Sequence, residues 1–544
     1  MSLDFNHLEE CFGFALDNIA QHGDTDIFLF PYETRMFEDE REKLIKSLMD
    51  TYINFSDRVE ESSPINISTF STVGYLGYRW VTQIDPYWNV FFLGLILNLS
   101  SKIEQQRKNT DCVYSYRIQP DEELKSIFNK EIGWRNYQEK SIEYCNSNEN
   151  VNYILSCDIA DFYTRVYHHP LENALQRIDE PSYDKAKKIM SLLQKFSKMT
   201  SYGLPVGGAA SRILAELALN KIDNLLAIRG IKFKRFVDDY YIFCNSSGEA
   251  RIKLGELSTL LMQNLGLTIQ KHKTNIYSKE EFIAITEAKL YGSERGDGDI
   301  DQNRKRFMSL DITYDPYSQN ADDNYDTLKR ELQGFDLLGL LGEEINKSRI
   351  NQSLSKKIIR SLAILDNELL SKATIVVFDN LEILYPIYIN LVQTILSNWK
   401  RLSSDAINHL YLKLYELIKE RSYIIENEVN ASYTIKLLSK ENNETNQYYL
   451  LEVHRLQSDS LLIGQYVFQV MAKWNNTDWL SNEIKKFSTM NQLHRRLAIL
   501  SSYLLGDEGQ HWRQHHKKQF NFLENIYKDW GAFRKNQNNL GNAL

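Results

Sequence analysis

The chain has 544 residues, of which 43% are hydrophobic and 25% charged, and its net charge is −8. This length allows two to four domains with sizeable cores, and the acidic balance argues against a protein that coats nucleic acid over its whole surface, while leaving room for a local basic channel. The five cysteines show no metal-binding spacing, which fits a reducing cytoplasm. The longest apolar run, residues 88–99, is too short to span a bilayer, so we expect no membrane partner.

Residues 1–150 are predicted to be mostly helical, with aromatic loops, and residues 151–300 to alternate strand and helix. The predicted elements of this second part are a strand over 151–159, helices over 182–199 and 209–226, a hairpin over 233–244, a helix over 248–265 and a strand over 267–277. Their order predicts an α+β domain with helices on one face of an antiparallel sheet.

Two adjacent carboxylates, Asp238 and Asp239, lie at the tip of the predicted hairpin. Taken alone, the pair is either a solvated turn or part of a metal site, because like charges repel and tight turns prefer glycine at the second position. A third carboxylate, Asp158, ends the apolar strand, so the three together could hold two divalent ions for phosphoryl transfer. Oxygen ligands favour Mg²⁺, with Mn²⁺ as the alternative. We expect nearby Asp161 to act as a helix N-cap rather than as a ligand.

A glycine-rich stretch, residues 202–212, lies between these carboxylates and leads into a helix, where backbone N–H groups favour anions. In chain order, four segments resemble motifs A to D of reverse transcriptases. They are CDIADFY (157–163), GLPVGGAASR (203–212), FVDD (236–239) and GLTIQKHKT (266–274). The loop, together with a long helical C-terminus, resembles the abortive-infection and defence-associated reverse transcriptases of bacteria.

The resemblance implies a polymerase palm and fingers followed by an all-α domain of HEAT-like or irregular solenoid type. Residues 1–150 would form the N-terminal and fingers region, residues 151–300 the palm, and residues 301–544 the helical domain. The implied catalytic residues are Asp158, Asp238 and Asp239, which would bind the metal together with Ile159. The implied nucleotide-binding residues are Arg117, Ala160, Tyr163, Val206, Gly207 and Lys273. Tyr163 matches the aromatic residue that excludes a 2′-hydroxyl, and Lys273 matches the lysine near the leaving pyrophosphate.

One position departs from the family pattern. Most reverse transcriptases carry glutamine where this chain has Val206, and valine offers only apolar contact, which puts ordinary template reading in doubt. From the four motifs we expect a DNA polymerase of reverse-transcriptase type in antiphage defence. The alternative is template-independent or protein-primed synthesis by the same palm. The expected partners are deoxynucleoside triphosphates, a DNA product, an RNA template or an associated non-coding RNA, and a second copy of the chain or a defence partner.

From about residue 330 onward, apolar spacing predicts long helices. They cover residues 328–341, 356–370, 380–400, 406–424, 461–474 and 493–505. A different class of protein would also fit this half: an interaction protein with a vestigial palm, although the intact aspartates argue against it. His511 and His515 are more typical of a solvated helix than of a metal site, and His168–His169, before Pro170, are predicted to lie in a loop.

Overall fold

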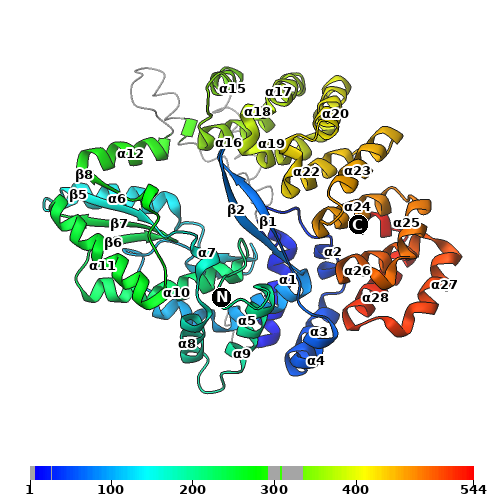
Figure 1. Ribbon diagram of the computed structural model, residues 1–544, viewed down its shortest axis with the longest axis horizontal. Helices are drawn as coiled ribbons and strands as arrows, with labels where there is room; N and C mark the ends of the chain where they lie inside the picture. The colour runs from blue at the N-terminus through cyan, green and yellow to red at the C-terminus, as the bar shows by residue number, and fades with distance from the viewer. Residues whose placement is uncertain (1–6, 26, 292–306, 309–334, 544) are drawn as a thin grey trace. The chain divides into compact units, whose positions relative to one another are not determined.

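The computed structural model describes residues 7–25, 27–291, 307–308 and 335–543 (Figure 1). The chain divides into two compact units, one made of residues 1–69, 80–283 and 468–544 and the other of residues 70–79 and 284–467. The boundaries predicted at residues 150 and 300 are based on the positions of the motifs. The two units are based on packing, and packing places residues 468–544 in the first unit.

A four-stranded antiparallel sheet in the order β6-β7-β5-β8 forms the centre of the first unit. Its strands are β5 (Tyr153–Asp158), β6 (Phe233–Phe236), β7 (Asp239–Cys244) and β8 (Asn275–Ser278). The predicted hairpin over 233–244 is confirmed, with Val237 and Asp238 as the connection. The predicted strand over 267–277 is wrong before residue 275, because Lys271–Lys273 form a 3-10 turn that ends the irregular approach to the sheet.

Helices cover both faces of this sheet, which corrects the expectation of helices on one face only. Alternate residues of β7 point to opposite faces. Tyr241 packs with Tyr137 of α6 (Trp134–Ser147) and Phe282 of α12 (Lys279–Tyr291), whereas Tyr240 hydrogen bonds to Asp223 of α10 (Ala209–Ile228). All residues of β7 after Asp239 are buried, as expected for a strand covered on both sides.

The helices around the sheet largely match their predictions. They are α7 (Phe162–Arg165), α8 (His168–Ile178), α9 (Asp184–Phe196), α10 (Ala209–Ile228) and α11 (Ser247–Leu265). Ser246 caps α11 by accepting a hydrogen bond from the Glu249 N–H, and Gly266 ends it in the left-handed conformation. The predicted loop at His168–His169 is wrong, because α8 begins there; Pro170 fits the first turn, where its missing N–H has no helical partner.

The N-terminal part is mostly helical, as predicted. Its elements are α1 (Leu8–His22), α2 (Glu33–Asp39), α3 (Arg41–Ile53), α4 (Phe55–Glu61), β1 (Asn66–Val73), β2 (Gly77–Ile84), α5 (Pro86–Gln106), β3 (Ile118–Asp121) and β4 (Ser126–Phe128), followed by α6. The apolar run 88–99 lies in α5 and is almost wholly buried in the protein. Within the described residues no single helix is long and apolar enough to cross a membrane; only the bent pair Asn367–Asp379 and Leu381–Ser397, taken together across an 85° break, reaches that length and apolarity.

The C-terminal part is helical, as predicted. Its helices are α15 (Leu337–Ile345), α16 (Gln352–Ser361), α17 (Asn367–Asp379), α18 (Leu381–Leu384), α19 (Tyr388–Ser397), α20 (Ser404–Lys419), α21 (Tyr423–Glu426), α22 (Glu428–Leu438), α23 (Glu444–Leu456), α24 (Leu461–Lys473), α25 (Thr477–Ile484), α26 (Gln492–Ser501), α27 (Gly506–His516), α28 (Phe522–Asn536) and α29 (Leu540–Ala543). Several predicted helices contain a break, and residues 328–334 lie outside the described part of the chain.

Two rows of helices organise the second unit. In one row, α16 packs against α19 and α19 against α22. In the other row, α17 packs against α20 and α20 against α23 (Figure 1). Short polar side chains cap the starts of five of these six helices by accepting hydrogen bonds from backbone N–H groups, and α19 is the exception. The capping residues are Asn351, Asp366, Ser403, Asn427 and Asn443. This layered arrangement agrees with the predicted solenoid-like pattern.

Candidate active site

The register of the sheet brings the three aspartates together. Asp158, the last residue of β5, lies directly opposite Asp239, the first residue of β7. Asp238 occupies the turn, and its carbonyl oxygen accepts a hydrogen bond from the Ile159 N–H at 3.1 Å. Residues 80 positions apart in the chain thus meet at one end of the sheet, as the sequence predicted for Asp158, Asp238 and Asp239.

Negative charge is poorly compensated at this end of the sheet. Burial and the neighbouring carboxylates of Asp158 and Asp239 together raise the pKa of Asp238 to about 7. The cation beside them is Lys273, whose Nζ lies 2.5 Å from Asp158 Oδ2. This contact joins motif D to motif A, and it brings the predicted lysine to the aspartates.

The donor set suits a divalent cation, because carboxylate oxygens are its preferred ligands and the raised pKa of Asp238 marks a site short of positive charge. The side chains are not already arranged as a cage: among the described residues no three His, Cys, Asp or Glu side chains converge as a metal site. Lys273 engages one oxygen of Asp158. The role of Asp158, Asp238 and Asp239 as metal ligands stays a prediction, and binding through that oxygen would require Lys273 to release it.

The backbone after Asp158 is held firmly. The Ile159 N–H donates to Asp238, the Ala160 N–H donates to the Thr268 carbonyl at 2.9 Å, and the Gln270 N–H donates to the Asp158 carbonyl at 2.7 Å. The N–H groups of Ile159 and Ala160 are thus used inside the protein, and their predicted contacts with metal and triphosphate stay predictions. Asp161 stands at the N-cap of α7, but its side chain makes no capping hydrogen bond within the described residues.

Tyr163, the last residue of motif A, contacts motif B. Its carbonyl accepts the Leu204 N–H at 2.8 Å, which ties the two motifs together. Burial raises the pKa of Tyr163 well above its usual value, with the charged groups of Arg212 and Asp238 close enough to influence it. The predicted sugar-contacting residue is therefore near the aspartates.

The motif B loop is anchored to β2 rather than to the aspartates. The Val206 N–H donates to the Thr82 Oγ1 at 2.7 Å, and Gly207 adopts a φ of 111°, which side-chain-bearing residues rarely adopt. Val206 lines a cavity of about 320 Å³ that also contains Trp80 and Tyr202. The nucleotide-binding roles of Val206 and Gly207 stay predictions.

Arg117 makes contacts that differ from its predicted role. Its guanidinium forms an ion pair with Glu104 at 2.5 Å and donates to the Lys108 carbonyl at 2.6 Å. Its side chain is largely buried, and a triphosphate would have to replace Glu104 as its partner. His511 and His515 are exposed on α27, so the solvated-helix interpretation is confirmed.

Sequence reasoning missed a buried ionic network directly beneath the hairpin. Arg235 of β6 is fully buried and binds both Asp223, at 2.6 Å, and Glu216, at 2.9 Å, on α10. Arg107 adds a second guanidinium 2.6 Å from Glu216. Burial alone would raise the pKa of Glu216, but Arg235 and Arg107 outweigh it and hold that pKa below its usual value. One signal was present: Glu216 and Asp223 are seven residues apart, which places both on one helix face.

This network also fixes the turn that carries the aspartates. Val237 has a φ of 56°, a conformation that a β-branched residue adopts only at a cost in energy. Arg235 donates from Nη1 to the Val237 carbonyl at 2.8 Å. The guanidinium thus stabilises the strained residue immediately before Asp238.

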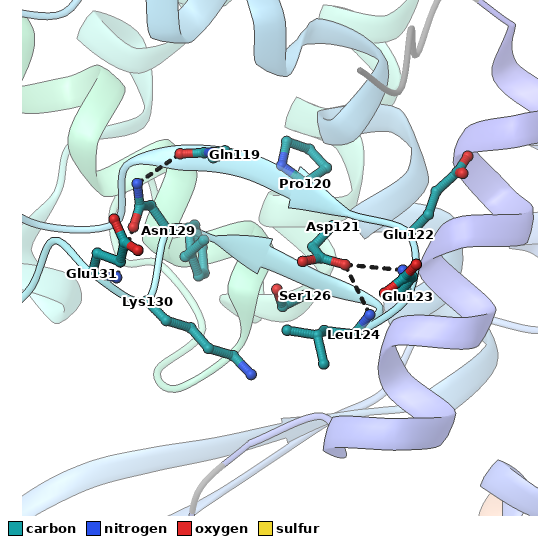
Figure 2. A pocket seen from close by; sticks show the side chains of 11 residues that line it. Gln119, Pro120, Asp121, Glu122, Glu123, Leu124, Ser126, Asn129, Lys130 and Glu131 are labelled. Carbon is teal, nitrogen blue, oxygen red and sulfur yellow. Dashed lines mark hydrogen bonds between the residues drawn. The ribbon is translucent and has the colours of Figure 1, made fainter. Parts of the chain in front are cut away.

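A further cavity, of about 540 Å³, lies on the β3–β4 hairpin and contains none of the predicted site residues. Figure 2 shows Asp121 accepting hydrogen bonds from the backbone of Glu123 and Leu124, which closes the hairpin turn. The catalytic roles of Asp158, Asp238 and Asp239 at the end of the sheet stay predictions.

Residues 98–310 match the family model described as reverse transcriptase (RNA-dependent DNA polymerase). The chain carries a reverse transcriptase domain. It is accordingly a nucleotidyltransferase, an RNA-directed DNA polymerase of the reverse transcriptase type, and the family uses divalent metal ions. The predicted palm and fingers followed by a helical region are confirmed.

Other comparisons add little to this domain match. Two solved structures are similar over 75% of this chain and 70% of theirs: telomerase from Candida albicans in complex with a fragment of telomeric RNA, at 10% identity and a TM-score of 0.29, and apo telomerase from Candida tropicalis, at 11% identity and a TM-score of 0.29. No curated protein matches the chain.

Proposed function

We propose that this reverse transcriptase makes DNA from deoxynucleoside triphosphates with Mg²⁺ and acts in the cytoplasm of bacteria in antiphage defence. The observation that carries the chemistry is the pairing of Asp158 with Asp239, with Asp238 beside them. The defence role rests on the resemblance of the motif B loop and helical C-terminus to defence-associated enzymes. The five cysteines, all in the described part of the chain, are free, which supports a reducing compartment.

Asp158, Asp238 and Asp239 would hold the metal ions. When bound, these ions would neutralise the triphosphate and favour deprotonation of the attacking hydroxyl. Tyr163 would contact the sugar and exclude a 2′-hydroxyl. Lys273 Nζ, already beside Asp158, would donate its proton towards the leaving pyrophosphate.

Val206 favours a second form of the same activity. An aliphatic side chain beside the nascent base pair cannot hydrogen bond to it, so we propose that template dependence is loose and that synthesis can begin without a nucleic-acid template or primer. In the protein-primed form, a side-chain hydroxyl of the protein would attack the α-phosphate in place of a 3′-hydroxyl.

The test is incubation of nuclease-treated protein with labelled deoxynucleotides and Mg²⁺, with and without added RNA. Portions of the product are then digested with protease or nuclease and sequenced. Product made only with added RNA, and faithful to it, would contradict loose template dependence. Label that remains with protein after denaturation and is released by protease would support protein priming.

A further inference from the structure

A second cavity beside motif B contains a buried carboxylate with unused bonding capacity. The cavity has a volume of about 320 Å³ and is lined by residues from the end of α1, from the β3–β4 hairpin and from the start of α10. Asp24 is 5% exposed, and its Oδ2 has no hydrogen-bond partner in the described part of the chain. Its Oδ1 receives a long bond, 3.4 Å, from Gln83, and the backbone N–H groups of Asp24 and Thr25 also contribute to stabilising the carboxylate. Such burial is costly unless a donor is supplied.

Two positively charged side chains also line the cavity. Lys130 and Arg212 line it, together with Gly207 and Ala209 at the start of the 20-residue helix α10. Figure 2 shows the Lys130 side chain extending away from the two strands of the hairpin. Helix N-termini and cationic side chains both attract phosphate groups.

An aromatic pair lies beside the cavity. Phe128 lines the cavity, and its ring centroid lies 5.2 Å from that of Tyr116. The Arg212 guanidinium in turn lies 5.2 Å from the Tyr116 ring centroid. Arg212, which lines the cavity, and Asp238 both influence the pKa of Tyr163.

We propose that this cavity is a guanine-nucleotide site, in which Asp24 accepts hydrogen bonds from the base while the phosphates face Lys130 and Arg212. An ionised carboxylate can only accept, and guanine alone among the four bases presents two adjacent donors, N1–H and the 2-amino group, on one edge. Adenine and cytosine place an acceptor beside their amino group, and thymine flanks its single N–H with two carbonyls. Phe128 supplies the apolar contact for the base.

This inference rests on the proposed function and deepens it: Asp24 makes guanine the preferred base of the substrate. Burial raises the pKa of Asp24 to about 7, so the carboxyl group is partly protonated near neutral pH, and the two guanine donors would favour its ionised form. Loose template dependence would then be accompanied by a product rich in guanine.

The first test measures binding without catalysis. Equilibrium dialysis of the full chain in EDTA with labelled dGMP, dIMP, dAMP, dCMP and dTMP should show dGMP binding about 10- to 100-fold more tightly than dAMP, dCMP and dTMP. The dIMP value should be intermediate, because inosine lacks the 2-amino group. The Asp24→Asn variant should lose the preference, while Asp57→Asn, which removes an exposed carboxylate on α4, should keep it.

Equal binding of all four bases, or an unchanged preference in Asp24→Asn, would overturn the site. If Asp24→Asn fails to fold, the affinities of dGMP and dIMP for the unaltered chain are compared instead. Equal affinities would show that Asp24 does not bind the 2-amino group and would overturn the site.

The second test, incorporation of each dNTP with Mg²⁺, separates this site from the proposed function. Incorporation without guanine bias leaves the polymerase standing and removes the site. A preference for binding dGMP in a protein that incorporates no dNTP would keep the site and contradict the proposed polymerase function.

Discussion

Two carboxylate clusters lie at the same end of the β6–β7 hairpin, and they differ in charge balance. Beneath the hairpin, Glu216 and Asp223 face two arginines, and every group is buried and paired. At the turn itself, Lys273 pairs with Asp158, and the pKa of Asp238 rises to about 7 because of burial and like charge. The balanced cluster stabilises the fold, whereas the unbalanced one has capacity for a cation, as functional sites commonly do.

The largest expected effect is the loss of nucleotide incorporation when the unbalanced cluster is altered. The double substitution Asp238→Asn with Asp239→Asn should abolish nucleotide incorporation, because the metal ions lose shared ligands. Thermal unfolding should be unchanged or shifted upward, since like-charge repulsion is removed. A filter assay with labelled dNTPs and a melting curve measure both; wild-type incorporation in this variant would contradict the assignment of the aspartates.

The balanced cluster should respond in the opposite way. Arg235→Met leaves Glu216 and Asp223 with Arg107 alone and should cost about 3–5 kcal/mol of unfolding free energy. Urea unfolding measures the loss. The matched control is Arg135→Met, which removes an exposed pair with Glu139 and should cost about 0.3–0.5 kcal/mol. Similar losses in the two variants would mean that the buried network is not a stability element.

A third cluster of buried charged residues should make the stability of the protein depend on pH. Glu33 is buried beside Asp85 and Arg496, and burial raises its pKa to about 7. Because the folded protein keeps this proton while the unfolded chain loses it near pH 4.5, the stability from Glu33 is complete below pH 4.5 and is lost as pH rises to about 7.

The Glu33→Gln side chain cannot ionise but can still accept a hydrogen bond from the Tyr527 hydroxyl. This variant should therefore lack the decline in unfolding free energy with rising pH, which amounts to about 1–3 kcal/mol. Urea unfolding of both proteins at pH 5 and pH 8 measures it. Parallel pH profiles would show that Glu33 is ionised throughout this range.

Tyr163, which is influenced by both Glu216 and Asp238, provides the smallest expected effect. Tyr163→Val should reduce discrimination against ribonucleotides on the order of tenfold, because a bulky group beside the sugar is lost. Competition between dATP and ATP in single incorporation measures the ratio, with Tyr202→Val as the control for removing a nearby aromatic. An unchanged ratio would place the sugar-contacting residue elsewhere.

The sequence predicted the palm well because its chemistry is local. Asp158 ends an apolar strand, and Asp238–Asp239 interrupt two strand-forming runs, so both positions could be assigned from their immediate neighbours. The buried network escaped prediction because Arg235 looks like any basic residue until α10 is packed against it. Asp24 escaped for the same reason, since its burial depends on Gln83 and the start of α10.

Two local patterns were also misjudged or overlooked. The apolar residues 267–269 resemble a strand, but the backbone of Thr268 and Ile269 instead supports motif A, and pairing with β5 begins only at Asn275. The β1–β2 hairpin was not predicted, although residues 66–73 show partial alternation of buried and open positions once folded.

The pairing of Asp158 with Asp239 also limits how the length of β5 can vary. Side chains alternate between faces along a strand, so a one-residue insertion or deletion within Tyr153–Asp158 would turn Asp158 to the opposite face of the sheet. Paired changes of two residues would keep the face but move the carboxylate about 7 Å along the strand. Homologous enzymes can therefore differ freely in the residue types of this strand, but the number of residues before the aspartate must stay the same.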